Sequence, residues 1–539
     1  MESQRILARP PAKDVILNSL LENVRNYNAR QPDLYVGLRE CTLNAEMPLL
    51  LNPRAAPLAC REPSAEFEAV NGHFSAQVHA FFNALREFED MADKQLAEEL
   101  PLIRPGEGLW LTIRVAHQSF DIYPDCLHRT FHTRCLTVRD YDSLPLLDRA
   151  ARLRVFPALN YAAELGMEFS HMRPVSLRVP FELATRLSHL RELDCPWLWE
   201  RLPIAFSSHA LRRYARVWGG PWRDARVEFG RCVRDVMPML PASLAKCRFW
   251  FWKAGQYGED ADQMVPMPDL VHASSPSLLT SEFGDEDPVS IGLRELGSRL
   301  EELDIRALIT PDLFGRTSDG TTGYPTSWPR MRHLKVEFHP CSPNGNWYFS
   351  GPRGEDPHPK GFPITRDEHY PPSQENSDDK ETHDVWSRED DEYEGDEDMS
   401  LDRQPDMFRV LPIAERINPL LLSFVSSLQR ENMPSLQAAE LFTWLTWRPS
   451  EKRAQEYKVS DDAPPSAEDE VVLFRWGVKY EAPENGGNAK VTWQIGESWR
   501  PSSQVISVFE DLVGDHGGRI EWKAFEYVGE REPDLEKYI

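Results

Sequence analysis

The sequence has 539 residues, of which 41% are hydrophobic, and its formal net charge is −25. That amount of apolar side chain can bury one long core or several ordinary domains. The strong negative charge repels nucleic acids and anionic membranes, so we expect neither as a partner and predict protein partners instead.

The sequence lacks the marks of secreted and membrane proteins. No stretch approaches the ~20 consecutive apolar residues that span a bilayer, the N-terminal residues lack an apolar signal core, and no Asn-x-Ser/Thr acceptor occurs. The eight cysteines form no Cys-x-x-Cys pair, and several of them fall on apolar positions. We therefore expect reduced thiols and a cytoplasmic or nuclear protein.

Helical and strand patterns alternate in the N-terminal part of the chain. Residues 1–34 are predicted to form a cap built on one amphipathic helix, with apolar residues at 15, 16, 17, 20, 21 and 24. Apolar spacings of three and four predict a helix over 76–88, and strict alternation predicts a strand over 109–115. A shorter alternation predicts another strand at 136–138.

Two cysteines and two histidines lie close together at Cys126, His128, His132 and Cys135. These are zinc ligand types, but their spacing matches no common zinc module, and the predicted strand at 136–138 follows at once. A surface turn with one buried thiol is the favoured interpretation, so we assign no metal ligand.

An internal repeat is the most informative feature of the sequence. Apolar residues recur with spacings of three, three and two at Leu187, Leu190, Leu193 and Cys195. Spacings of three indicate a turn, and the final spacing of two indicates a strand with both side chains in one core. One unit cannot cover its own apolar face, so the units must stack. The pattern recurs, with small changes, at 38–43, 147–155, 240–249, 296–305, 328–336 and 433–441.

The repeat is irregular and covers residues 35–350. Regular leucine-rich repeats take ~20–29 residues, whereas the units here are longer, so we expect long insertions and a helix over 180–190. Charged residues between the buried positions are expected to be exposed on a curved binding sheet: Arg154, Asp194, Arg248, Asp304 and Lys335.

Seven arginines gather between residues 212 and 234, with Tyr214, Trp218 and Trp222 among them. Arginine beside aromatic rings suits phosphate, carboxylate or base binding. The favoured interpretation is a solvated helix face with tryptophan packed inward. The alternative is an anion-binding patch, which the acidic run at 375–402 could cover from within the chain. The candidate partner-binding residues here are Arg212, Arg213, Arg216, Trp222, Arg223 and Arg226.

Trp250 and Trp252 alternate with Phe249 and Phe251 on a predicted strand. One side of that strand would hold the phenylalanines and the other the tryptophans. Exposed tryptophans are favoured anchors of protein interfaces, but side chains of this size are more often buried. We predict burial under an insertion and keep Trp250 and Trp252 as candidate interface residues.

The second half of the chain changes composition three times. Residues 351–405 are predicted to be an acidic, disordered insertion, because 375–402 hold 14 acidic and two basic residues. Residues 406–448 carry the last repeat, and 449–469 form a polar linker.

Residues 470–539 are predicted to form a small mixed α/β cap on the repeats. Alternation predicts strands over 472–478 and 491–495, a helix begins near Pro501, and a last strand surrounds Ile520. Stacked repeats require such a cap at their ends.

Several phrases resemble the leucine-rich-repeat region of fungal F-box-type proteins. They are LSHLRELDCPWL, DYDSLPLLDRAARLRVFP, LEELDI, WPRMRHLKVEF, WYFSGPRGED, FRVLP and MPSLQAAEL, and the resemblance covers roughly residues 35–530. It implies an α/β, irregular leucine-rich-repeat-like solenoid that presents a captured protein to a cullin-type ubiquitin ligase through a Skp-type adaptor. The chain departs from this family at its N-terminus, where one short amphipathic helix stands in place of a full F-box.

The sequence thus predicts a protein-binding repeat scaffold. It serves either as the substrate-recognition subunit of an F-box/cullin-type ubiquitin ligase or as a stand-alone adaptor or structural interaction protein. No Gly-x-Ser-x-Gly elbow, phosphate-binding glycine loop or His-Glu-x-x-His motif occurs. We therefore predict no enzymatic activity, no catalytic residue and no cofactor.

Overall fold

The chain forms two compact units, each of which is described by itself. Unit 1 comprises residues 1–199, 234–249 and 373–375, and unit 2 comprises the remainder. The border between them thus falls inside the stretch predicted as one solenoid. The computed structural model describes residues 6–7, 11–30, 38–53, 58, 62–94, 108–116, 118, 120, 134–157, 173–198, 200, 219–252, 262–272, 282–315, 327–370, 406–458, 472–483, 488–496, 499–514, 517–524 and 527–528.

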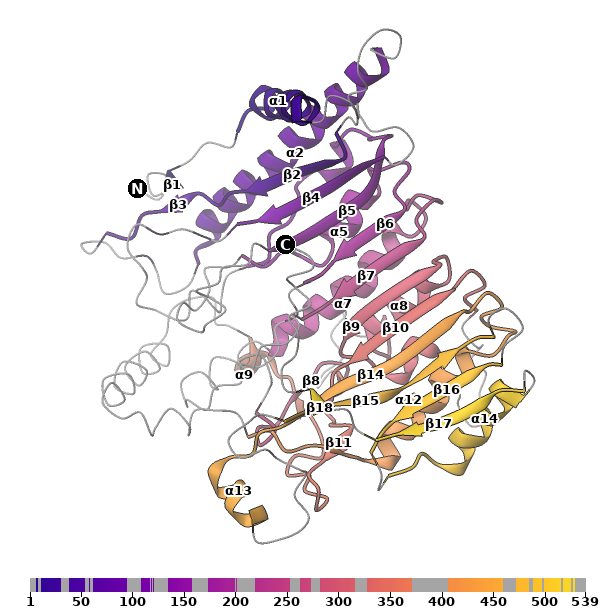
Figure 1. The fold of residues 1–539 in the computed structure, drawn as a ribbon. Helices are drawn as coiled ribbons and strands as arrows, with labels where there is room; N and C mark the ends of the chain where they lie inside the picture. Colours follow the sequence, from indigo (N-terminus) through magenta and orange to yellow (C-terminus); the bar gives the residue numbers. More distant parts are fainter. Residues whose placement is uncertain are drawn as a thin grey trace. The chain divides into compact units, whose positions relative to one another are not determined.

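Unit 1 is built on a parallel sheet whose strands follow one another in chain order (Figure 1). All neighbouring pairs are parallel, and the apolar residues of each strand are buried on one side. The last residue of its final strand, Trp250, belongs to unit 2. The strands are β2 (Glu40–Ala45), β4 (Leu109–Val115), β5 (Ala150–Pro157), β6 (Glu192–Cys195) and β7 (Lys246–Trp250).

Helices cover the apolar side of the unit 1 sheet. Helices α2 (Ser64–Lys94) and α5 (Val179–Ala184) pack against it (Figure 1), and α1 (Lys13–Arg30) lies against α2. The short strands β1 (Ile6–Leu7) and β3 (Leu49–Leu50) pair with each other, and the 3-10 helix η2 spans Tyr141–Ser143.

Unit 2 holds a mixed sheet. Strands β9 (Glu302–Ala307), β10 (His333–Phe338) and β14 (Ala438–Trp447) are parallel, as repeats require. Strand β15 (Val472–Glu481) then reverses direction. Beyond it lie β16 (Lys490–Gln494), β17 (Arg519–Lys523) and β18 (Tyr527–Val528), with α14 (Ser503–Gly514) packed against β16 and β17. The strands and helix predicted for 470–539 are therefore confirmed.

The remaining elements of unit 2 are short strands and helices. They are β8 (Pro268–Asp269), β11 (Phe349–Ser350), β12 (Phe362–Pro363), β13 (Leu411–Pro412), α7 (Gly219–Val236, whose last three residues belong to unit 1), α8 (Pro288–Gly297), α9 (Arg366–His369), α12 (Ala414–Ser427), α13 (Glu451–Lys458) and the 3-10 helix η4 (Pro311–Phe314).

The predicted turn is present before β6, β10 and β14, and it has the same hydrogen bond in all three places. The second apolar position of the pattern donates its N–H to the carbonyl of the first. The N···O distance is 3.2 Å for Leu190 to Leu187, 3.1 Å for Met331 to Trp328 and 3.2 Å for Leu436 to Met433. An apolar spacing of three therefore indicates a hydrogen-bonded turn, and the alternation of buried and exposed residues along the strand begins after it.

A second repeated feature links each strand start to the next. The residue before a strand accepts two backbone N–H groups from the following repeat. The carbonyl of Arg191 accepts from Ala245 and Lys246, and those of Glu301 and Arg332 do the same for residues 332–333 and 437–438. We call this arrangement the carbonyl staple. It fixes where neighbouring parallel strands begin.

Several predicted boundaries are wrong. Leu136 forms one isolated bridge with Val175 rather than a strand. Its side chain is buried all the same, so the alternation correctly predicted burial but not a strand. The helix expected over 180–190 is α5, which ends at Ala184 where the repeat turn begins. The linker predicted at 449–469 contains α13, whose Tyr457 is buried and donates a hydrogen bond to Glu355.

The predicted disordered insertion does not begin at 351. Residues 351–370 are packed into unit 2, and only 371–405 lie outside the described residues. Asp356 accepts hydrogen bonds from Arg409 (2.6 Å) and Arg416 (2.7 Å). These two arginines follow the acidic run in the sequence, so their attraction for Asp356 was not visible as a local pattern.

Candidate protein-binding surface

The sheet of unit 1 presents one polar side. On β4 the burial pattern alternates strictly between apolar residues in the core and Trp110, Thr112 and Arg114 on the other side. The pleat sends alternate residues of every strand to this same side. We call it the unit 1 face; its members are Glu40, Thr42, Asn44, Trp110, Thr112, Arg114, Arg152, Arg154, Glu192, Asp194, Lys246 and Arg248.

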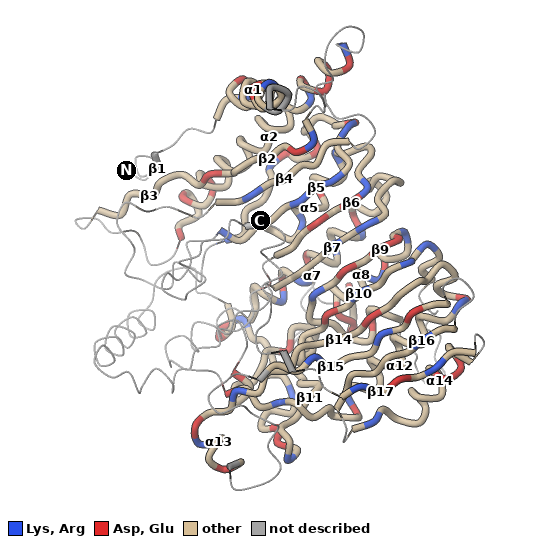
Figure 2. Tube along the Cα trace, viewed as in Figure 1, with Lys and Arg blue, Asp and Glu red and all other residues tan. Residues whose placement is uncertain are grey.

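Strand register aligns the charged residues of the unit 1 face into rows. Arg154 lies opposite Thr112 on one neighbouring strand and opposite Asp194 on the other, and Asp194 lies opposite Arg248. Figure 2 colours basic and acidic positions along these neighbouring strands. The row therefore places one carboxylate between two guanidinium groups.

A third arginine reaches the same carboxylate. Oδ2 of Asp194 accepts from Nη2 of Arg152 (2.7 Å) and from Nε of Arg154 (2.8 Å), while Nε of Arg248 lies 3.5 Å from Oδ1. The Asp194 side chain is 0% exposed, whereas the arginine side chains are 17–19% exposed. We call these four residues the Asp194 cluster.

The prediction that Asp194 would be exposed is therefore wrong. Alternation correctly sends its side chain away from the core, but three long arginine side chains from β5 and β7 cover it. Arg154 and Arg248 are themselves half-buried by that contact. Solvent reaches the guanidinium groups here and the carboxylate of Glu192, which is 32% exposed and lies 3.1 Å from Arg152, but not the carboxylate of Asp194.

Arg114 extends the positive region. It is half-buried, its Nε is shielded from solvent without a hydrogen-bond acceptor, and no ion pair or ring contact involves its guanidinium among the described residues. Beside it, the Trp110 ring lies under two cations, with Cζ of Arg39 at 3.7 Å and Cζ of Arg152 at 5.1 Å. Cation–π contact of this kind holds arginine side chains flat against the sheet.

The unit 1 strands carry a positive surplus in an acidic protein. Their charged residues are five cations (Arg114, Arg152, Arg154, Lys246 and Arg248) and three anions (Glu40, Glu192 and Asp194). The difference is +2, within a chain whose net charge is −25. The surplus is concentrated where four arginines lie on consecutive strands.

The cysteine that follows Asp194 offers no reactive group to this surface. Cys195 points into the core, and burial, with a smaller contribution from Asp194, raises the pKa of its thiol well above the usual value. A buried, protonated thiol behaves as a small hydrophobe. The chemistry that the unit 1 face offers is anion binding by guanidinium groups.

The polar side of the unit 2 sheet differs because its charges alternate. Register places Lys335 between Asp304 and Glu440, and Glu440 opposite Lys479. Arg475 Nη2 bonds Glu440 at 2.5 Å. Neighbouring charges of opposite sign cancel one another's field. The strands of this sheet carry seven cations and six anions, so their surplus is +1.

The described part of the predicted arginine patch is not a solvated face. Of its candidates, Arg212, Arg213 and Arg216 lie outside the described residues, whereas Arg223 and Arg226 are buried. Arg226 Nη1 pairs with Glu200, and its Nη2 lies 2.8 Å from both carboxylate oxygens of Asp287. Trp222 is buried as predicted and donates to Glu200 at 2.8 Å.

These four residues, Arg226, Glu200, Asp287 and Trp222, form what we call the Arg226 cluster. Burial by itself would lower the pKa of Arg226, but Asp287 and Glu200 outweigh it and hold the pKa above its usual value. Burial raises the pKa of Glu200 in spite of its contact with Arg226. The cluster joins α7 to the N-terminus of α8, so its position serves the fold of unit 2.

The tryptophans of the predicted interface are buried, which confirms the favoured interpretation. Nε1 of Trp250 donates to Asp304 at 3.1 Å, and Cζ of Arg306 lies 4.1 Å from the Trp250 ring. The Trp252 ring meets His339 edge-on at 5.5 Å. Among the described residues, Asp304 and Arg306 of β9 contact Trp250, and His339, just after β10, contacts Trp252.

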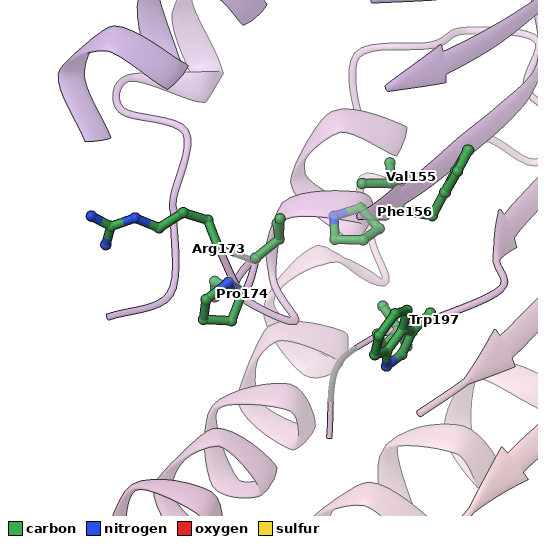
Figure 3. Close-up of a pocket in the computed structure, with 9 residues that line it drawn as sticks. Val155, Phe156, Arg173, Pro174 and Trp197 are labelled. Atoms are coloured by element: carbon green, nitrogen blue, oxygen red, sulfur yellow. The ribbon is translucent and has the colours of Figure 1, made fainter. Parts of the chain in front are cut away.

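A hollow in unit 1 lies near the end of β5, and Figure 3 shows Val155, Phe156 and Trp197 around it. The space open to the centre of a water-sized sphere is about 10 Å³, which is room for a single water molecule. Arg173 points away from this space and pairs with Glu62 at 2.5 Å (Figure 3). The hollow is too small for an organic ligand.

The cysteine–histidine motif is only partly visible. Cys126, His128 and His132 lie outside the described residues, and Cys135 is exposed. In the described part of the chain, no three His, Cys, Asp or Glu side chains come together as a metal site. The helices within that part also include none with the length and apolar character needed to cross a membrane.

Arg114 and Arg152 are two arginines of this surface that the sequence patterns did not single out. The signal was present: Arg114 is the one charged residue of LWLTIRV and occupies a polar position in its alternation. Comparison with protein-family models, with curated proteins and with solved structures finds no match for the chain. Its function must therefore be argued from these residues.

Proposed function

We propose that the chain is a protein-binding scaffold, built as an irregular leucine-rich-repeat-like solenoid, and that the unit 1 face is its binding surface. The observation that carries this proposal is the placement of a polar, arginine-rich face on a parallel sheet. Parallel sheets normally have helices on both sides. In unit 1, α2 and α5 lie on the apolar side, opposite the charged residues (Figure 1).

The repeated hydrogen bonds support the solenoid part of the proposal. The turn that precedes β6 recurs before β10 and β14, and the carbonyl staple recurs at Arg191, Glu301 and Arg332. Repeats that stack through identical local contacts produce extended sheet surfaces, which such proteins use for binding.

The scaffold could act within a ubiquitin ligase, as the family resemblance implies, or as a stand-alone adaptor. One observation favours the stand-alone version. The apolar residues of α1, Leu17, Leu20 and Val24, are buried, and α1 packs against α2. Helix α1 therefore uses its apolar side inside unit 1, which leaves that side unavailable to a Skp-type adaptor.

The test is affinity purification of the full chain, followed by reconstitution with each purified candidate partner. Thr112→Trp places a large side chain in the middle of the unit 1 face and should abolish direct binding. Asn83→Trp, on the exposed side of α2, is the matched control and should leave binding unchanged. Both variants should unfold at the wild-type temperature.

Partners that survive Thr112→Trp but are lost with Asn83→Trp would move the binding surface to the helices and contradict the proposal. The same purification distinguishes the two versions. Recovery of a Skp-type adaptor and a cullin, reduced by Val15→Asp on the exposed side of α1, would establish the ligase version. Val15 is 61% exposed, so this substitution leaves the packing on α2 intact.

A further inference from the structure

Resting on the proposed function, we propose that the partner bound by the unit 1 face is an acidic, extended segment of another protein. Its aspartate or glutamate side chains would bind Arg114 and the arginines of the Asp194 cluster. Charge complementarity carries this proposal, because the strands hold a surplus of +2 (five cations against three anions) in a chain of net charge −25.

Arg114 is the primary contact. A shielded guanidinium nitrogen without an acceptor costs free energy, since it has lost water without gaining a hydrogen bond. Nε of Arg114 is in that state. No ion pair involves this guanidinium among the described residues, so a partner's carboxylate can bind its terminal nitrogens through a charge-assisted bond, which is about twice as strong as a neutral one.

The Asp194 cluster adds a second binding point. Three guanidinium groups share the carboxylate of Asp194, which is 0% exposed, and Arg152 also pairs with Glu192 at 3.1 Å, so the three arginines exceed these two carboxylates by one positive charge. Asp194 holds the arginines in place, and Trp110 stacks against Arg152. Arginines fixed in this way lose little side-chain entropy when they bind an anion.

The spacing of the two points fits an extended peptide. Arg114 and Arg154 lie on adjacent strands and are two residues apart in register. Strand geometry places their Cα atoms about 8 Å from each other. Alternate side chains of an extended chain are about 7 Å apart on one side. An acidic-x-acidic sequence can therefore present one carboxylate to each arginine.

The charge of the whole molecule selects a short acidic segment over a polyanion. Fields decay within ~8 Å at physiological salt, so a peptide confined to the unit 1 strands experiences the local surplus. A nucleic acid or an anionic membrane extends well beyond that distance and meets the rest of a chain with net charge −25.

The experiment selects random peptides of about 12 residues, displayed on phage, against the immobilised full chain. We expect enrichment of acidic-x-acidic sequences. For the enriched peptides, Arg114→Glu should weaken binding at least about tenfold, and Lys523→Glu less than about twofold. Lys523 is an exposed cation of unit 2, so both variants change the net charge equally. Because no described contact depends on the Arg114 guanidinium, the variant should keep the wild-type unfolding temperature.

The outcomes separate this proposal from the one on which it rests. Enriched peptides that are neutral or basic, or that bind Arg114→Glu as tightly as wild type, overturn the acidic partner and leave the scaffold standing. If no peptide is enriched, both the acidic-partner proposal and the scaffold proposal fail for partners that bind as extended segments. Peptides in which phosphoserine replaces the acidic residues test a phosphopeptide as the partner. Tighter binding of that version at the same arginines would replace the carboxylate partner with a phosphopeptide.

Discussion

The Asp194 cluster of unit 1 and the Arg226 cluster of unit 2 have opposite compositions. In the first, three arginines surround one carboxylate. In the second, two carboxylates surround one arginine, and all three side chains are at most 2% exposed. Both clusters bring together residues that are distant in sequence. They differ in whether the excess charge is buried or lies at the surface.

Burial explains why one cluster serves the fold and the other is available for binding. The carboxylates of the Arg226 cluster find additional donors inside unit 2: Trp222 donates to Glu200, and the Ser290 backbone N–H donates to Asp287 at 2.9 Å. The arginines of the Asp194 cluster remain 17–19% exposed at the sheet surface. An excess of charge is tolerated in the core only when other groups satisfy it.

Replacing Arg226 should have the largest effect. Arg226→Met leaves Glu200 and Asp287 buried without their cation, so unit 2 should lose about 4 kcal/mol of unfolding free energy. The measurement is hydrogen exchange of α7 and α8 in the full chain. Arg231→Met on the same helix is the control and should cost below about 1 kcal/mol, because its ion pairs are partly exposed. Equal effects of the two changes would contradict the contrast between the clusters.

Replacing Asp194 should destabilise the protein less than replacing Arg226 does, and it should strengthen the binding of acidic peptides. In Asp194→Asn the three arginines lose the carboxylate that they share, but Arg152 keeps its ion pair with Glu192 and the other two can turn toward water. Unit 1 should therefore lose only about 2 kcal/mol, measured by hydrogen exchange of β5 and β6. Acidic peptides selected on the wild type should bind more tightly, because an internal competitor has been removed. Glu440→Gln on the unit 2 sheet is the control and should leave peptide binding unchanged.

Asp356 provides an intermediate case with a defined pH dependence. Burial by itself would raise its pKa, but hydrogen bonds from Arg409 and Arg416 outweigh burial and place the pKa below its usual value. A carboxyl group with a lowered folded pKa stabilises the protein above the unfolded pKa of about 3.9, and this contribution disappears as the pH falls through the folded pKa.

Asp356→Asn should therefore cost about 1–2 kcal/mol, equally at pH 7 and pH 5, and the difference from wild type should shrink below about pH 4. Urea unfolding across this range is the measurement. Asp367→Asn, at an exposed position of α9, should stay within about 0.5 kcal/mol of wild type throughout. A cost that is independent of pH would show that the ionised carboxylate is not the source of the stabilisation.

The sequence predicted the strands well and the charged clusters poorly, for one physical reason. Leu193 and Cys195 are buried because of their spacing, which is a local property of a strand. The burial of Asp194 depends on Arg152 and Arg248, which lie on different strands. Arg226 likewise meets Glu200 and Asp287, which are 26 and 61 residues away in the chain. Periodicity reports which side of a strand a residue occupies, but not what covers it.

The carbonyl staple has a consequence for how this chain tolerates change in length. One pair of neighbouring strands starts at residues 302 and 333, and the next pair starts at 333 and 438. In both pairs the carbonyl just before the first strand accepts N–H groups from the residue before the second strand and from its first residue. Strand alignment is thus set by contacts at the strand starts and does not depend on the number of residues between them. Insertions or deletions between these strands can accumulate over evolution, or be engineered as fusion points, while β7, β10 and β14 keep their alignment with the strands before them.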